Sequence, residues 1–119
     1  MYRKIEILTE WARPVVDRLP KTTAFTAMGS RTVNELQDAM AAVTIGLLSE
    51  KGEPRLNAAN LLIVRMVSVK TAFRIYYSYA SQTGNPRVLT AAQYAYFLRS
   101  MKEISVETER WRAANAKKD

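Results

Sequence analysis

The sequence predicts an all-α protein, an up-down-up-down antiparallel four-helix bundle. Apolar residues recur every three or four positions in four segments, the connections between them are short, and no segment shows β alternation bounded by hairpin turns. Helices joined by short connections pack antiparallel around one core. A chain of 119 residues, 48% hydrophobic, suits a single domain. We predict the bundle over residues 1–116, followed by a frayed basic tail at 117–119.

The first helix is predicted over residues 2–19. Its apolar stripe consists of Ile5, Leu8, Ala12, Val15 and Leu19. Pro14 interrupts the pattern, because it cannot donate a hydrogen bond to the carbonyl of Glu10 and its ring crowds that turn. The residues favour a tolerated bend, or a separate helix beginning at Pro14, over a bend that directs Trp11 and Arg13 towards a neighbouring subunit.

The second helix is clearest over residues 32–49. Its predicted stripe is Val33, Leu36, Met40, Val43 and Leu47. Thr32 and Glu35 have the spacing of a capping box, which places the helix start at Thr32, although the pattern also allows a start near Phe25. Gly52 is the predicted stop signal, and Pro54 is suited to the first turn of the next helix.

The third helix is predicted over residues 54–80. Its main stripe is Ala59, Leu62, Met66, Val69, Phe73, Tyr76 and Ala80. Further apolar residues lie outside this stripe: Leu61, Ile63, Val64, Val67 and Ile75. A helix that is apolar around most of its circumference is buried on more than one side. We therefore expect a second surface of this helix to serve oligomerisation.

The fourth helix follows a turn that contains Gly84, Asn85 and Pro86. Thr90 and Gln93 have the spacing of a capping box, and the helix is predicted to continue to about residue 114. Its stripe is Tyr94, Phe97, Met101, Ile104, Thr108 and Trp111.

The residue inventory argues against an enzyme. The chain has no histidine and no cysteine, which removes the commonest general base, the thiolate nucleophile and nearly every zinc site. We predict no catalytic residue, no cofactor and no metal. Glu103 and Glu107 are one helical turn apart and offer a carboxylate pair for acid–base chemistry or cation binding. Ion pairs with Arg99 and Arg110, three or four residues away, explain them more simply.

The charge favours a binding role. The chain carries 18 Lys and Arg against 11 Asp and Glu, a net charge of +7, which favours nucleic acid, an acidic protein face or a membrane surface as partner. Solubility is the alternative explanation. The sequence has no apolar run of roughly 20 residues and no signal-peptide pattern at its start, so no membrane-spanning segment is expected. We predict no membrane partner. The lack of cysteine fits a reducing cytoplasm.

The excess of positive over negative charge is concentrated in the third helix. Residues 54–80 contain no acid and carry Arg55, Arg65, Lys70 and Arg74. Lys70 and Arg74 are four residues apart on one face, where like charges repel unless an anionic partner offsets them. Solvated side chains whose stems cover apolar surface remain the alternative. Glu35 and Asp38 are interpreted as favourable charges near the start of the second helix.

The chain has a set of residues in a characteristic order and spacing: Trp11, Pro14, Pro20, Lys21, Phe25, Gly29 and Arg31, then Leu56-Asn57-Ala58-Ala59-Asn60, then Tyr94 and Trp111. In this order they resemble the Avd (accessory variability determinant) family of small four-helix bundle proteins. Members typically have an aromatic residue in the first helix, a proline shortly after it, a Pro-basic pair, and a Phe and Gly-x-Arg entering the second helix. The resemblance covers essentially the whole chain.

The resemblance implies a non-enzymatic partner protein of a diversity-generating retroelement. Family members are basic, barrel-shaped homopentamers that associate with the reverse transcriptase of the element and its template RNA. The complex makes mutagenised cDNA, and the polymerase supplies the chemistry. A related branch of bundles, encoded within ribosomal RNA intervening sequences, shares the fold without that role. A scaffolding bundle of this second type is therefore the alternative function.

On this interpretation, the cations contact phosphates of RNA or DNA, or the polymerase, through charge and without base readout. The predicted contact residues are Arg65, Lys70 and Arg74, followed by Lys21, Arg31 and Arg55. The family often has basic residues in the middle of the third helix, at positions that correspond here to Val67 and Thr71. Lys70 and Arg74 are neighbours of those positions and not their equivalents.

Overall fold

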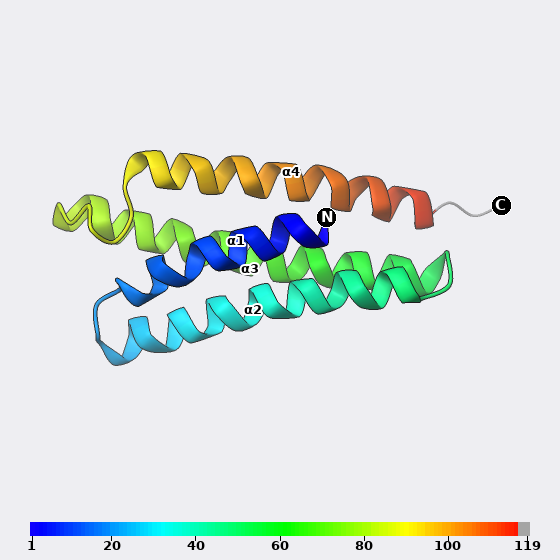
Figure 1. Cartoon of the computed structure of the whole chain (residues 1–119), viewed down its shortest axis with the longest axis horizontal. Coiled ribbons are helices and arrows are strands. Elements are labelled where there is room, and N and C mark those ends of the chain that lie inside the picture. The colour runs from blue at the N-terminus through cyan, green and yellow to red at the C-terminus, as the bar shows by residue number, and fades with distance from the viewer. Residues whose placement is uncertain (117–119) are drawn as a thin grey trace.

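The computed structural model describes residues 1–116, and this part of the chain forms four helices. They are α1 (Tyr2–Asp17), α2 (Thr23–Leu48), α3 (Glu53–Thr83) and α4 (Ala91–Ala116). Each helix packs antiparallel against the next, and α4 also contacts α1 (Figure 1). The predicted all-α bundle is confirmed.

The four helices differ in length, and this divides the bundle into two regions. α1 has 16 residues, whereas α2, α3 and α4 have 26, 31 and 26. α1 runs along one half of the molecule, so only the other three helices reach the end where α2 turns into α3 (Figure 1). We call residues 45–61 and 109–116 the three-helix end, and the remainder the four-helix body.

Aromatic side chains fill the core of the four-helix body. Phe73 of α3 and Phe97 of α4 are fully buried and stack with their ring centroids 4.2 Å apart. Trp11 of α1 stacks on Phe73 with a centroid distance of 5.7 Å and contacts Tyr96 at 5.2 Å. Such ring pairs stabilise a core beyond the area that they bury. Trp11 is therefore half-buried and packs against the core of its own chain.

α1 continues through Pro14 as one helix that ends at Asp17. The interpretation of Pro14 as the start of a separate helix is therefore wrong. The stripe predicted for α1 is buried at every position. It continues in Leu19, which lies just beyond the helix and is only 4% exposed.

α2 starts well before the predicted capping box. Its N-cap is Thr22, whose side chain accepts a hydrogen bond from the backbone N–H of Phe25 at 3.2 Å. Thr32 lies inside the helix, where its hydroxyl bonds to the carbonyl of Met28 and to the hydroxyl of Tyr76 at 2.6 Å. The capping box of Thr32 and Glu35 is therefore wrong, because α3 engages these polar side chains instead.

The predicted stripe of α2 is also partly wrong. Leu36 and Val43 are buried, but Leu47 is 63% exposed. The other buried residues of α2 are small or polar: Gly29, Thr32, Glu35, Ala39, Ala42 and Gly46. Small side chains let α2 approach α1 and α3 closely, so its contact face is not the row of largest apolar residues.

The predicted stop of the second helix at Gly52 is wrong, because α2 ends at Leu48 with Ser49 as its C-cap. The other helix ends follow the predicted signals. Gly52 is the N-cap of α3 with a positive φ of 97°, and Pro54 lies in the first turn. Thr90 and Gln93 form the predicted capping box, with backbone-to-side-chain distances of 3.1 and 2.9 Å. α3 and α4 extend to Thr83 and Ala116, a few residues beyond their predicted ends. The predicted frayed tail at 117–119 lies outside the described residues.

α3 is the one described helix whose length and composition would let it cross a membrane. An 18-residue window of α3 has a mean hydropathy of 1.2, although the sequence has no uninterrupted apolar run of that length. Of this window, 39% is buried inside the bundle. The core helix of a bundle has the same composition, so the hydropathy of α3 is weak evidence for a membrane span.

Candidate nucleic-acid and partner-binding surfaces

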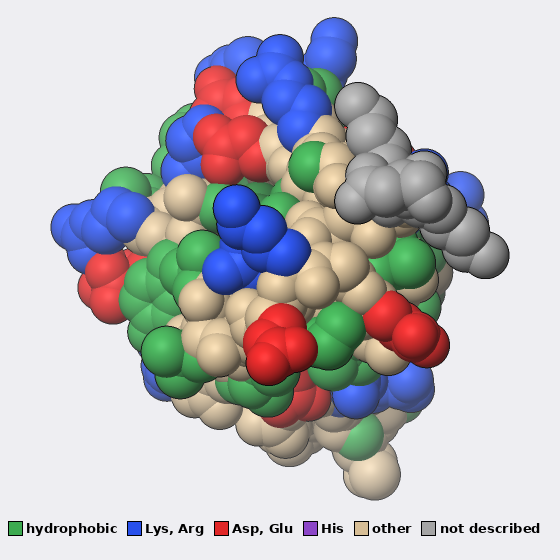
Figure 2. Space-filling model, turned by 90° about the vertical axis from the view of Figure 1, so that its right-hand side faces the viewer, with side chains coloured by type: hydrophobic (Ala, Val, Ile, Leu, Met, Phe, Trp, Pro, Cys, Tyr) green, Lys and Arg blue, Asp and Glu red, His purple; other side chains and the backbone are tan. Residues whose placement is uncertain are grey.

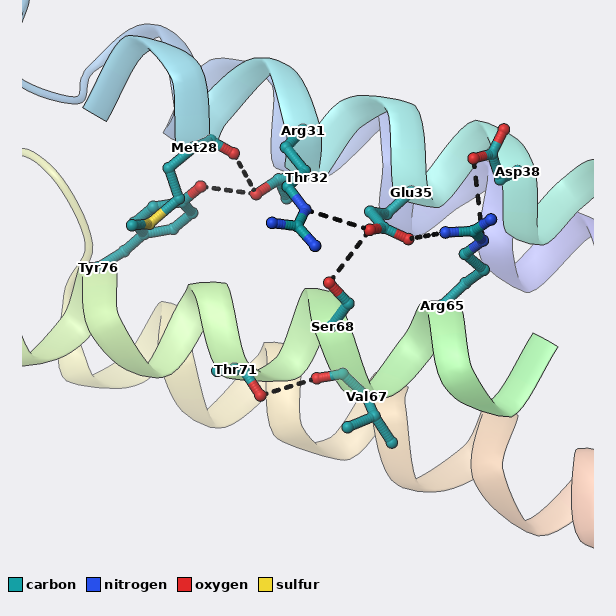
Figure 3. Close-up of polar contacts among 10 residues, drawn as sticks. All are labelled: Met28, Arg31, Thr32, Glu35, Asp38, Arg65, Val67, Ser68, Thr71 and Tyr76. Atoms are coloured by element: carbon teal, nitrogen blue, oxygen red, sulfur yellow. Dashed lines mark hydrogen bonds and ion pairs between the residues drawn. The ribbon is translucent and has the colours of Figure 1, made fainter. Parts of the chain in front are cut away.

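The buried carboxylate of Glu35 organises the seam between α2 and α3 (Figure 3). Glu35 is 6% exposed, and its oxygens accept hydrogen bonds from Arg65 Nη1 at 3.2 Å and from Ser68 Oγ at 3.2 Å. Arg31 Nε approaches it at 3.5 Å from the solvent side. A buried carboxylate requires cationic and hydrogen-bonding partners, so these contacts hold α2 and α3 together.

The ion pair with the buried carboxylate of Glu35 gives Arg65 a structural role. Arg65 Nε also lies 3.9 Å from the carboxylate of Asp38. α3 carries no acid near Arg65, but α2 supplies two counter-ions across the helix seam (Figure 3). Glu35 and Asp38 lie well inside α2, so their interpretation as charges near its N-terminus is wrong.

Two more of the predicted contact residues bind carbonyl oxygens where a helix ends. Lys21 Nζ donates to the carbonyl of Asp17, the last residue of α1, at 2.9 Å. Arg55 Nε donates to the carbonyl of Ser49, the C-cap of α2, at 3.0 Å. Cations at these positions satisfy unpaired carbonyls and complement the helix dipole.

Lys70 and Arg74 are exposed on α3, and within residues 1–116 no carboxylate lies within ion-pair distance of either. The six predicted residues therefore do not form one surface. Lys21 follows α1 at one end of the bundle, and Arg55 opens α3 at the other (Figure 1). Arg31 and Arg65 lie on the α2–α3 seam, apart from Lys70.

The structure adds cations of α4 that the sequence analysis did not select. Lys70 and Lys102 line the same groove between α3 and α4. Lys102 also lines a neighbouring hollow together with Arg99 and Arg110. Arg74 lies one helical turn from Lys70 on the same side of α3, and we define the basic face as Lys70, Arg74, Arg99, Lys102 and Arg110. Positions 99, 102 and 110 fall on one side of a helix, and this spacing of cations along α4 is the signal that would have identified it.

The ion pairs that the sequence predicts within α4 would have neutralised Arg99 and Arg110, but they are not found among the described residues. Glu107 pairs with Lys4 of α1 and not with Arg110, and no ion pair between Arg99 and Glu103 is found among the described residues. The hydrogen bond from Lys4 lowers the pKa of the Glu107 carboxyl below its ordinary value and raises the pKa of Lys4. The partner is distant in sequence, so spacing within α4 did not reveal it.

Glu103 and Glu107 line the same hollow as Lys102. In the part of the chain that the structure describes, no group of three or more His, Cys, Asp or Glu is placed to hold a metal ion. Glu107 is already engaged by Lys4, which leaves Glu103 as the only unpaired carboxylate of this pair among those residues. The arrangement is that of a charged protein surface.

No protein-family model matches the chain, and neither a curated protein nor a solved structure does. The four-helix bundle is established by the structure.

Proposed function

We propose that this chain is a non-enzymatic accessory protein of a diversity-generating retroelement, related to the Avd family. As a basic homo-oligomeric bundle in the cytoplasm, it binds the reverse transcriptase and template RNA and so supports mutagenic cDNA synthesis. The observation that carries the proposal is the basic face, whose five cations lie on a rigid pair of helices with no ion-pair partner among residues 1–116. Such cations release counterions from phosphate and give affinity without base readout.

Exposed apolar side chains support self-association, for which the family's homopentamer is the proposed form. At the three-helix end Leu48 is 84% exposed. Other exposed residues of this region are Ile45, Leu47 and Leu61. Figure 2 shows hydrophobic side chains at the surface of this end, between charged ones. Apolar surface of this kind becomes favourable when further copies of the chain cover it.

The alternative is a scaffolding bundle of the ribosomal RNA intervening-sequence type, without a reverse transcriptase partner. The internal contacts of Arg31, Arg65, Arg55 and Lys21 favour it, because these four cations already stabilise the fold. Fewer cations are then free for a partner than the net charge of +7 suggests.

A salt series tests the nucleic-acid role. Replacing Lys70 and Arg74 with Ala should weaken binding to single-stranded RNA and reduce the slope of log K against log salt by about 1.4, because each phosphate contact contributes about 0.7. The matched control replaces Arg13 and Lys51, two exposed cations away from the basic face, with Ala. Equal effects of the two double variants would remove the basic face as the RNA site.

Oligomeric state and polymerase binding separate the two functions. Light scattering on the purified chain should give a pentamer, and the chain should co-purify with the reverse transcriptase encoded beside it. An oligomer that binds neither RNA nor the polymerase would establish the scaffold. A monomer would remove the proposed assembly.

A further inference from the structure

The groove between α3 and α4 has an apolar floor that reaches the surface. It encloses about 400 Å³. Its apolar lining includes Ile63, Met66, Val67, Leu98, Met101 and Val106. Val67 is 59% exposed, Val106 42% and Leu98 37%. Isolated exposed apolar residues are ordinary, but residues that gather in one groove indicate a binding surface.

The groove is electrostatically asymmetric along its length. α3 and α4 run antiparallel, so Lys70 lies towards the same end as Leu98, with Lys102 one turn farther along α4. Glu109 lies at the opposite end, where its carboxylate accepts two hydrogen bonds from Arg112 at 2.9 and 3.0 Å. The two lysines have no carboxylate partner within residues 1–116. One end of the groove is therefore cationic and the other is close to neutral.

We propose that this groove binds an amphipathic helix of a partner protein. The stripe of apolar residues on that helix packs on the floor, and acidic residues near its C-terminal end lie beside Lys70 and Lys102. The lining of α4 extends over residues 98–109, which corresponds to about 16 Å, or three helical turns. The negative end of the helix dipole also favours placing the C-terminus at the cationic end.

The chemistry of the groove argues against the other occupants. Single-stranded nucleic acid binds through aromatic rings on which bases stack, whereas the lining here is aliphatic. A second copy of this chain would bring another net charge of +7 to a cationic rim, so the proposed self-association is assigned to the three-helix end and not to this groove. A small polar ligand needs converging polar groups, but Lys70 and Glu109 lie at opposite ends of the groove, and the hydroxyl of Thr108 donates to the carbonyl of Ile104.

This inference requires neither RNA nor a polymerase. If the chain is a retroelement accessory protein, the partner helix belongs to the reverse transcriptase, and that identification rests on the proposed function. If the chain binds an acidic amphipathic helix but neither RNA nor the polymerase, the groove proposal is supported and the proposed function is contradicted.

The test uses fluorescence anisotropy with synthetic peptides of about four helical turns. The probe carries leucines at i, i+3, i+4 and i+7 with glutamates near its C-terminus. One comparison peptide has the same composition with the stripe scrambled, and another has lysines in place of the glutamates. We expect the full-length chain to bind the probe and to bind each comparison peptide about tenfold more weakly or not at all.

Two valines of α3 supply a matched pair of variants. Val67→Arg places a charge in the floor, whereas Val64→Arg makes the same change at a residue that is similarly exposed, 61%, but does not line the groove. Val67→Arg should weaken probe binding about tenfold or more, and Val64→Arg should leave it within about twofold. Val106→Arg repeats the change from α4, and a far-ultraviolet circular dichroism melt checks that each variant folds.

The lysines are tested separately. Lys70→Ala with Lys102→Ala should weaken the probe about three- to tenfold at low salt, and the difference should shrink at high salt. The inference is overturned if the probe does not bind at about millimolar concentration, if Val64→Arg and Val67→Arg act equally, or if the lysine peptide binds as well as the probe. Binding of single-stranded RNA that Val67→Arg abolishes would assign the groove to nucleic acid and also overturn it.

Discussion

Different groups cover the hydrophobic core in the four-helix body and at the three-helix end. In the body, α1 covers the other helices and Trp11 stacks on Phe73 between them. At the three-helix end no part of α1 is present, and the ring of Trp111 packs directly against Gly46 of α2. At this end the Trp111 ring on Gly46 covers the core in place of α1. The comparison shows why the most exposed large apolar side chain, Leu48 at 84%, lies at the thinner end.

The largest expected difference between the two regions is in stability. Phe73→Ala empties the centre of the body and should lower the free energy of unfolding by about 3–5 kcal/mol, because it removes a fully buried ring and leaves a cavity. For a single copy of the chain, Leu48→Ala at the three-helix end should change it by less than about 0.5 kcal/mol, because Leu48 is 84% exposed there. Urea unfolding followed by circular dichroism measures both. Similar losses would show that Leu48 is covered in solution.

The contact between Trp111 and Gly46 is expected to have an intermediate effect. A Cβ atom at position 46 would overlap the Trp111 ring and would also lie 3.2 Å from Cβ of Ala58. Gly46→Ala should therefore displace the ring and cost about 1–3 kcal/mol, as overpacking does. Tryptophan fluorescence in a Trp11→Phe background reports the displacement. An unchanged emission spectrum with unchanged stability would mean that the ring does not close this end.

The smallest expected effect is a pH dependence that is confined to the body. Burial of the Tyr76 hydroxyl raises its pKa above the ordinary value, although the hydrogen bond to Thr32 acts in the opposite direction. The unfolded chain loses this proton first, so the stabilisation is complete below about pH 10 and declines as the pH rises towards the folded-state pKa. Each pH unit in this window costs at most about 1.4 kcal/mol.

Tyr76→Phe cannot ionise and is the matched variant for this effect. Unfolding curves collected from about pH 8 to pH 11 should show a steeper loss for the native chain than for Tyr76→Phe. Parallel losses would assign the alkaline instability to other groups, such as tyrosines nearer the surface.

Sequence periodicity predicted the bundle well because most helices bury one stripe of large apolar residues. The stripe of α1 and the aromatic residues Phe73 and Phe97 lie where spacing placed them. α2 was harder to interpret, because it uses Ala39, Ala42 and Gly46 for close approach and spacing analysis gives most weight to large side chains. Its true cap, Thr22, precedes a segment with a weak apolar pattern.

The candidate site was less predictable than the fold because charges pair across helices. Arg65 has no acid nearby in α3, yet Glu35 of α2 neutralises it. Glu107 is paired with Lys4 of α1, which leaves Arg110 available. A one-dimensional charge count cannot show which cations remain free, since that depends on how the helices are placed side by side.

The order of helix packing has a kinetic consequence. Apart from the contact of α1 with α4, every helix packs against its neighbour in sequence, across the short connections 18–22, 49–52 and 84–90. Little chain entropy is lost in closing such connections, so we expect folding within microseconds to milliseconds. We expect assembly to begin with the hairpin of α2 and α3, the pair with the most extensive contact, and to finish when α1 meets α4.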